Sequence, residues 1–177
     1  MEIRLLEPAD AEVFRDLRLR ALREAPGSFT TSYEEGARDD VARTAALFLR
    51  NEHGSPDDFA LGAFEGGSAG TAEGVIVGTA RLVREERRKV AHRASLRGMF
   101  VAPEAQGRGV GRALVDALVA RARTLPGLER INLTVMADND RAIRLYTRCG
   151  FTIWGREPLA MKRDGKYSDE LWMGLAL

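Results

Sequence analysis

Residues 101–112 read Val-Ala-Pro-Glu-Ala-Gln-Gly-Arg-Gly-Val-Gly-Arg, and this stretch decides the fold. It predicts the end of an apolar strand, a turn, a glycine-rich loop and then a helix over 112–123. A loop of this kind leaves backbone N–H groups without partners at the positive end of a helix dipole, where they attract an anion. Three glycines let a phosphate approach the backbone, and two arginines add positive charge. These residues are Gly107, Gly109, Gly111, Arg108 and Arg112.

The glycine spacing distinguishes this loop from two other phosphate-binding loops. A Walker A loop ends in Gly-Lys-Ser or Gly-Lys-Thr, and this one does not. A dinucleotide-binding loop has the spacing Gly-x-Gly-x-x-Gly, with an acidic residue at a strand end about 20 residues later. The spacing here is Gly-x-Gly-x-Gly, and Glu129 precedes the next strand instead of ending it. A nicotinamide-dependent reductase is therefore disfavoured.

A second motif follows the glycine loop later in the chain. It consists of Val135, Asn139, Ala142, Leu145, Tyr146, Gly150 and Phe151. Together with Gln106-x-x-Gly109-x-Gly111, which Val101-x-Pro103 precedes, it resembles the acetyl-CoA site of the GNAT superfamily of N-acetyltransferases. The motifs lie within residues 96–155, and the flanking segments match only in general layout.

The resemblance implies a fold of the α/β class. We expect a GNAT-like mixed, mostly antiparallel sheet of about seven strands with helices on both faces, in a single domain over 1–177. In this family the strand equivalent to 90–101 splays from the strand equivalent to 130–136, and the pantetheine arm of the cofactor lies in the gap.

Strands and helices are predicted from apolar periodicity and turn residues. Strands are expected at 3–6, 59–65, 75–84, 90–101, 131–135, 151–155 and 170–175, with a bulge at Gly98. Helices are expected at 8–24, 39–50, 112–123 and 139–149, with a loop at 28–36 and turns at 51–58 and 66–74.

The implied activity is transfer of the acetyl group of acetyl-CoA to a primary amine of a small molecule or peptide, directly and through a tetrahedral intermediate. An alkyl amine has a pKa near 10, so a general base or a water path must remove its proton at neutral pH. The oxyanion needs hydrogen-bond donors placed in advance. Tyr146 matches the family's tyrosine acid, which protonates the departing thiolate, although its apolar helical stripe also predicts a core position.

The resemblance assigns the remaining cofactor contacts to the strand end, the loop and the second motif. The assigned residues are Met99, Phe100, Val101, Gln106, Gly107, Arg108, Gly109, Val110, Gly111, Arg112, Asn139 and Tyr146. The loop would bind the pyrophosphate, and the backbone at 99–101 would bind the pantetheine and the thioester carbonyl. Asn139 would contact the cofactor, and its residue type also predicts a helix cap.

The general base has several candidates. Glu34 and Glu35 lie in the loop after the first helix, where this family often forms its acceptor wall. Asp169 and Glu170 precede the final strand. His92 alternates with apolar residues, which predicts a core or sheet-face position instead. The long central strand offers no carboxylate, which favours a water relay.

The acceptor remains open between an amino acid, a polyamine, an aminoglycoside and a protein N-terminus. Possible aromatic walls are Phe29, Tyr33, Tyr167 and Trp172, and the cations Lys162, Arg163 and Lys166 would favour an acidic group on the substrate. A second function class also stays open, which is an acetyl-CoA-binding sensor or accessory domain without turnover.

The composition limits the kinds of binding partner and the cellular location that we expect for this protein. The 177 residues are 45% hydrophobic and 30% charged, with a net charge of +1, so no basic field for nucleic acid is expected. Cys149 is the one cysteine, and neither a signal peptide nor a membrane span is apparent, so a cytoplasmic location is expected. Two histidines and one cysteine predict no metal site. Domains of this kind are often homodimers, but no sequence feature decides that.

Overall fold

The computed structural model describes residues 1–52, 57–66 and 74–177. The turns expected at 51–58 and 66–74 lie for the most part outside the described residues.

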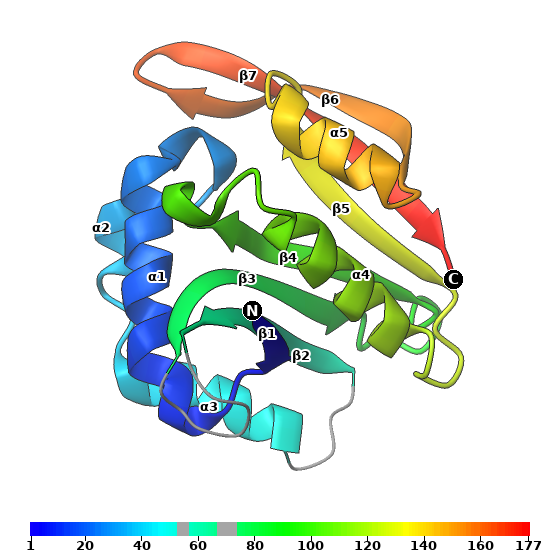
Figure 1. Ribbon diagram of the computed structural model, residues 1–177. Coiled ribbons are helices and arrows are strands. Elements are labelled where there is room, and N and C mark those ends of the chain that lie inside the picture. Colours follow the sequence, from blue (N-terminus) through cyan, green and yellow to red (C-terminus); the bar gives the residue numbers. More distant parts are fainter. Residues whose placement is uncertain (53–56, 67–73) are drawn as a thin grey trace.

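One seven-stranded sheet runs through the molecule in the order β1-β2-β3-β4-β5-β7-β6 (Figure 1). The strands are β1 (Glu2–Leu5), β2 (Asp58–Glu65), β3 (Val75–Arg84), β4 (Arg93–Val101), β5 (Arg130–Met136), β6 (Thr152–Arg163) and β7 (Lys166–Ala176). Neighbouring strands are antiparallel except β4 and β5, which are parallel. The expectation of a mixed, mostly antiparallel sheet is confirmed.

Helices cover both faces of this sheet. They are α1 (Ala11–Glu24), α2 (Tyr33–Gly36), α3 (Val41–Glu52), α4 (Val110–Ala122) and α5 (Asp140–Arg148), with short 3-10 turns η1 (Pro8–Asp10), η2 (Pro26–Ser28) and η3 (Pro103–Ala105). Side chains of β2 point alternately to the two faces of the sheet. Phe59 and Leu61 pack in the hydrophobic cluster with α4, whereas Ala60 packs in the cluster with α1 and α3 on the other face.

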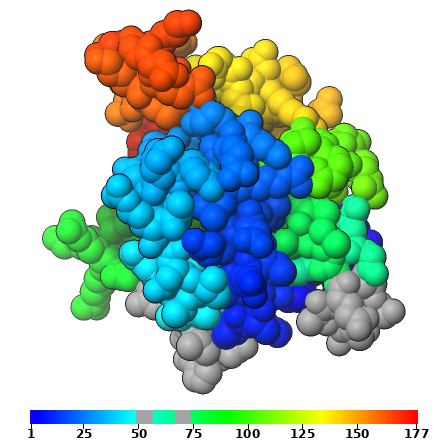
Figure 2. All heavy atoms as spheres, turned by 90° about the vertical axis from the view of Figure 1, so that its left-hand side faces the viewer, coloured from blue at the N-terminus to red at the C-terminus, as the bar shows by residue number. Residues whose placement is uncertain are grey.

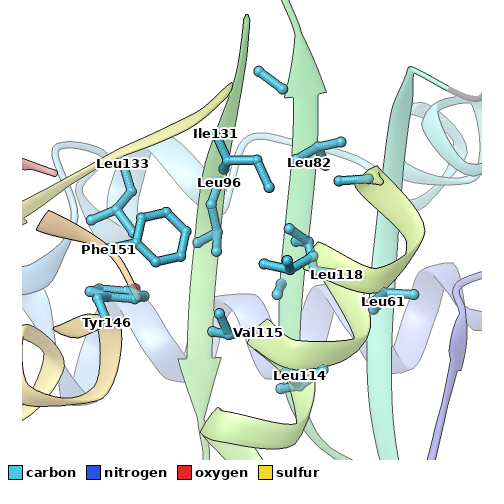
Figure 3. Packing of buried hydrophobic residues seen from close by; sticks show 14 of the residues in the cluster. Leu61, Leu82, Leu96, Leu114, Val115, Leu118, Ile131, Leu133, Tyr146 and Phe151 are labelled. Carbon is cyan, nitrogen blue, oxygen red and sulfur yellow. The ribbon is translucent and has the colours of Figure 1, made fainter. Parts of the chain in front are cut away.

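Helix α4 forms because its apolar side chains recur at helical spacing. Leu114, Val115 and Leu118 are fully buried and point at the sheet (Figure 3). There they pack in one hydrophobic cluster with Leu82 and Leu96. The helix begins at Val110, two residues earlier than predicted, because Gly109 adopts a left-handed conformation (φ 82°) and serves as its N-cap.

Strands β4 and β5 pair over only three residues and then diverge, as Figure 1 shows. The last pair is Ser95 with Asn132, so on β4 the residues from 96 onward have no strand partner on that side. The pairing of β3 with β4 shifts register between Thr79 and Arg81, and Gly98 on β4 has a φ of 60°. The bulge predicted at Gly98 is therefore confirmed, and it bends β4 away from β5.

Two sequence predictions about strands were wrong. Strand β4 starts at Arg93 instead of 90, and His92 lies exposed in the preceding turn, where its carbonyl accepts from the Glu129 and Arg130 amides. It therefore faces neither the core nor the sheet. The last two strands are also far longer than 151–155 and 170–175.

The long β6–β7 hairpin continues through Pro158, beyond the strand end expected at 155. Strand β6 is the edge of the sheet, where a missing N–H costs no ladder bond. A register shift between Glu157 and Met161 takes up the irregularity. Figure 2 shows the hairpin tip, in orange, above the N-terminal helical segment in blue, and the Arg163 guanidinium lies beside Gly27 of η2.

Candidate active site

The loop before α4 presents a row of free backbone donors. Gly107 and Gly109 have φ values of 78° and 82°, which a residue with a side chain adopts only under strain. Among the described residues, the backbone amides of residues 107–112 have no backbone acceptor. The first hydrogen bond of α4 runs from the Ala113 amide to the Gly109 carbonyl. The loop can therefore hold a phosphate at the positive end of α4.

Side chains from three directions fix this loop. The Gln106 amide nitrogen donates to the Val101 carbonyl at 2.8 Å, and its oxygen accepts from Arg141 of α5. Arg20 of α1 binds Glu104 of η3 through both carboxylate oxygens, at 2.6 and 2.7 Å. This pair lowers the pKa of Glu104 to about 2, so the carboxylate stays charged throughout the physiological range.

A cavity of about 560 Å³ opens between this loop, α5 and the diverging strand ends. Its lining includes Met99, Phe100, Val101, Gln106, Gly107, Gly109, Val110, Gly111, Arg112, Asn139 and Tyr146, all expected from the sequence. It also includes three arginines of α5 that the sequence reading missed, Arg141, Arg144 and Arg148. Free amides and several cations along a cavity of this size fit a coenzyme that carries several phosphates.

Arg108 was expected at the phosphate and does not line this cavity. It is exposed and pairs with Glu65 at the end of β2, at 3.0 Å. Arg112 lines the cavity and also pairs with Asp116 one turn along α4, at 3.2 Å.

Asn139 is both a cap and a cavity residue. Its side-chain oxygen accepts from the Ala142 amide at 3.1 Å and so begins α5, while its nitrogen lies 3.5 Å from the Ser28 hydroxyl. The second contact ties α5 to η2 across the opening.

Tyr146 lies on the wall of this cavity and of a second one behind it. Its ring is buried against the edge of Phe151, with ring centroids 5.9 Å apart (Figure 3). Burial raises the pKa of the Tyr146 hydroxyl, and the nearby Cys149 raises it further. The hydroxyl therefore keeps its proton at neutral pH.

The second cavity, of about 480 Å³, lies between β4, β5, β7 and the segment from α1 to α2. Its polar lining comprises Arg18, Ser28, Thr30, Thr31, Ser95, Arg97, Asn132, Thr134 and Glu170, and its aromatic lining comprises Phe29, Tyr146 and Trp172. The two cavities share residues of β4, β5 and η2, including Met99 and Thr134. A group bound in one can therefore reach a group bound in the other.

Comparison with known proteins identifies the family. A model of the acetyltransferase (GNAT) family matches residues 19–151. The chain belongs to this family.

Solved structures show the GNAT fold over the whole GNAT chain. An acetyltransferase of the GNAT family from Streptococcus pneumoniae has a TM-score of 0.88 at 23% identity and covers 99% of both chains. YncA, a putative acetyltransferase from Salmonella typhimurium solved with acetyl-CoA, has a TM-score of 0.81 at 22% identity and covers 100% of this chain and 94% of its own.

Curated relatives match over shorter segments. Spermidine N(1)-acetyltransferase of Vibrio cholerae is 33% identical over 78 residues, which are 44% of this chain and 45% of that protein. The L-amino acid N-acetyltransferase AaaT of Escherichia coli is 32% identical over 101 residues, 57% of this chain and 62% of its own. The GNAT chain thus spans about half to three fifths of the length of these two relatives.

The structure does not bring Glu34 or Glu35 to either cavity. Both are exposed on α2, and Glu35 accepts from the Ser32 amide at 2.7 Å as half of a capping box. That hydrogen bond lowers the pKa of Glu35. The 28–36 segment folds into η2 and α2 instead of an open loop, and this turns the two carboxylates toward solvent.

Several other expected acceptor residues also lie elsewhere. Tyr33, Tyr167, Lys162, Arg163 and Lys166 line neither cavity, whereas Phe29 and Trp172 line the second one. Asp169 binds the Leu159 amide and Arg156, which lowers the pKa of its carboxyl. Of the two late carboxylates, Glu170 is the one on the cavity wall.

Among the residues that the structure describes, no group of three or more His, Cys, Asp or Glu side chains is placed to hold a metal ion. Among the same residues, no helix is long and apolar enough to cross a membrane.

Proposed function

We propose that this GNAT chain transfers the acetyl group of acetyl-CoA directly to a primary amine of a small molecule or peptide. One observation carries the proposal: two cavities meet where β4 and β5 diverge, and Tyr146 lies on the wall of both. The first cavity fits a phosphorylated coenzyme, and the second fits a polar acceptor. The named relatives act on spermidine and on L-amino acids, which supports a small amine as the acceptor.

The chain would hold acetyl-CoA with three sets of groups. The amides of 107–112 bind the pyrophosphate, and the arginines of α5 (Arg141, Arg144 and Arg148) bind the remaining phosphate. The unpaired edge of β4 at 99–101 offers backbone donors and acceptors to the amides of the pantetheine arm, much as a neighbouring strand would. Acetyl-CoA supplies the activated acetyl group.

Glu170 and Tyr146 would then move the protons. Glu170 accepts a proton from the incoming ammonium, directly or through water, and so frees the nitrogen lone pair. The nitrogen forms a C–N bond to the carbonyl carbon, while a backbone N–H of β4 stabilises the charge that develops on the carbonyl oxygen. The C–S bond breaks, and the Tyr146 hydroxyl donates its proton to the sulfur. The nitrogen gives up its second proton, directly or through water, to the Tyr146 oxygen, which forms the amide and restores the hydroxyl, while Glu170 releases its proton to solvent. The balance is one amide, one thiol and one proton released to solvent.

The variant Tyr146→Phe tests this assignment and separates it from the binding-only alternative. We expect kcat to fall by about 10²- to 10⁴-fold, because a positioned proton donor contributes that much, while the Kd for acetyl-CoA stays unchanged. Tyr167→Phe is the matched control, since Tyr167 is exposed and lies outside both cavities. A parent protein that binds acetyl-CoA but acetylates no amine would instead support a sensor or accessory domain.

We also infer that residues 1–177 form one domain, because β1 and β7, from opposite ends of the chain, belong to one sheet.

A cytoplasmic location, the absence of a nucleic-acid partner and a homodimer stay predictions. Sedimentation of the purified protein would decide the last of these.

A further inference from the structure

The second cavity is lined by a cation, Arg18, for which the described residues provide no hydrogen-bond acceptor. Arg18 reaches its wall from α1, and the guanidinium stacks over the Phe29 ring, 4.4 Å from the ring centroid. The Nη1 nitrogen is buried and donates to no acceptor among the described residues. Neighbouring arginines of the same helix differ, because Arg15 donates to the Ala37 and Asp39 carbonyls and Arg20 binds Glu104.

This arrangement is costly without a ligand. A charge removed from water needs a counterion and hydrogen-bond acceptors to offset its lost hydration. Burial lowers the pKa of Arg18, and the attraction of Asp39 works against that shift only through space, with no hydrogen bond between them. The cation–π contact with Phe29 holds the guanidinium on the cavity wall.

The rest of the lining makes the cavity positive on balance. Arg97 adds a second cation beside the Gly98 bulge, where it is exposed. Glu170 is the one carboxylate in the described lining, and it comes from β7 instead of from α1 or β4. A polyamine would bring further positive charges toward Arg18 and Arg97, whereas an anionic group would pair with them.

We propose that the acceptor is an amine that carries its own carboxylate, as a free α-amino acid does, and that Arg18 binds this carboxylate through paired N–H···O bonds. The ammonium of the same molecule lies toward Glu170 and Tyr146. The proposal rests on the proposed function for the identity of the second cavity as the acceptor site. Planar guanidinium and carboxylate groups match in a bidentate fashion, which makes Arg18 a selectivity residue as well as a binding one.

Direct binding tests this inference without any need for turnover. We would titrate each of the twenty L-amino acids and its α-carboxamide into the protein saturated with CoA, by calorimetry at a pH where the amines of both series are protonated. At least one amino acid is expected to bind, and its carboxamide to bind roughly 10- to 100-fold more weakly, as expected for lost hydrogen bonds to a charged group. Equal affinity within each pair, or no binding by any amino acid, would overturn the inference.

Variants then assign the selectivity to Arg18. Arg18→Gln should remove the difference between acid and carboxamide and leave the affinity for CoA unchanged, which also reports that the variant is folded. Arg18→Lys keeps the positive charge but cannot form the paired hydrogen bonds, so its preference for the acid over the carboxamide should lie between those of the parent and Arg18→Gln. Arg88→Gln is the matched control because Arg88 is exposed and lies outside both cavities. An unchanged preference in Arg18→Gln would contradict the assignment.

Acetylation assays keep this proposal separate from the proposed function. If amino acids bind with the expected preference but no amine is acetylated, the proposed function fails and the carboxylate site stands. If spermidine or a peptide is acetylated while no amino acid binds, the carboxylate site fails and the proposed function stands.

Discussion

Tyr146 and Glu170 line the second cavity from different elements, α5 and β7, and we propose opposite proton-transfer roles for them. Tyr146 is buried, which keeps its hydroxyl protonated, whereas Glu170 is half-buried on the cavity wall. The pairing of an acid and a base in one site follows from these different environments. Two predictions belong to these single residues.

Glu170→Gln should lower kcat/KM at neutral pH by about 10²- to 10⁴-fold, because the amine then loses its proton only to solvent. The loss should shrink as the pH approaches the pKa of the amine, near 10, where the free base is already abundant. A pH–rate profile of the variant and its parent measures both effects. Glu34→Gln is the control, and its kcat/KM should match that of the parent. A large loss of kcat/KM in Glu34→Gln, with no loss in Glu170→Gln, would mean that Glu34 on α2 is the general base.

The pH profile of the parent should show no fall from tyrosine ionisation up to about pH 10, the ordinary pKa of a tyrosine. Burial raises the pKa of Tyr146, so the folded protein keeps the proton where the unfolded chain has begun to lose it. Above that pH the unfolded state binds fewer protons than the native state, and stability contributed by this group declines as pH rises. Absorbance of ionised tyrosine, compared between parent and Tyr146→Phe, checks this; a Tyr146 that titrates at or below pH 10 would contradict it.

At the scale of elements, α4 and α5 were the most predictable parts of the chain. Both begin with a local signal, the glycines of 107–111 and the Asn139 cap, and both carry apolar side chains at helical spacing. Strand β6 was the least predictable, because Pro158 and the charged residues around it read as a loop. Only the pairing with β7, which is invisible in a local pattern, extends it to Arg163.

Gly111→Val should close the coenzyme cavity from within α4. A Cβ at this position would lie 3.2 Å from a Leu145 methyl, 3.4 Å from the Met99 methyl and 3.7 Å from a Val101 methyl, so a larger side chain enters the gap between α4, α5 and β4. We expect the Kd for acetyl-CoA to rise by roughly 5- to 150-fold, since overpacking costs about 1–3 kcal/mol and each 1.4 kcal/mol is a factor of about ten. Ala120→Val, on the exposed side of the same helix, is the control. Unchanged binding in Gly111→Val, measured by calorimetry, would place the coenzyme elsewhere.

Leu114→Ala should destabilise the fold by about 2–5 kcal/mol, because the side chain is fully buried between α4 and the sheet and its removal leaves a cavity. Chemical denaturation followed by circular dichroism measures the change. Asp116→Ala, which removes an exposed ion pair with Arg112 and a polar contact with the Cys149 thiol, should change stability by less than about 1 kcal/mol. Similar losses for the two variants would mean that α4 is not packed as described.

At the scale of the whole molecule, the site exists because β4 and β5 separate after three residue pairs. The two sequence motifs line the first cavity in that gap, and their resemblance to a known family predicted most of that lining, but not Arg141, Arg144 and Arg148. The proposed acceptor side draws on Arg18 of α1, Arg97 of β4 and Glu170 of β7, which are far apart in the sequence. An arginine on a helix face and a glutamate in a charged strand have no local pattern that distinguishes them from solvated surface residues. Their roles depend on tertiary placement, and the sequence therefore named Glu170 only as one candidate base beside Glu34, Glu35 and Asp169.

The central claim is that this gap joins acetyl-CoA to an amine for direct transfer. The most direct test is to incubate the purified protein with acetyl-CoA and a panel of amino acids, polyamines, aminoglycosides and short peptides, and to identify products by mass. We expect an N-acetylated product from at least one amine, formed only when acetyl-CoA and the protein are both present. Tight binding of acetyl-CoA without any acetylated product would contradict the proposed transfer, and no binding of acetyl-CoA would contradict the assignment of the site itself.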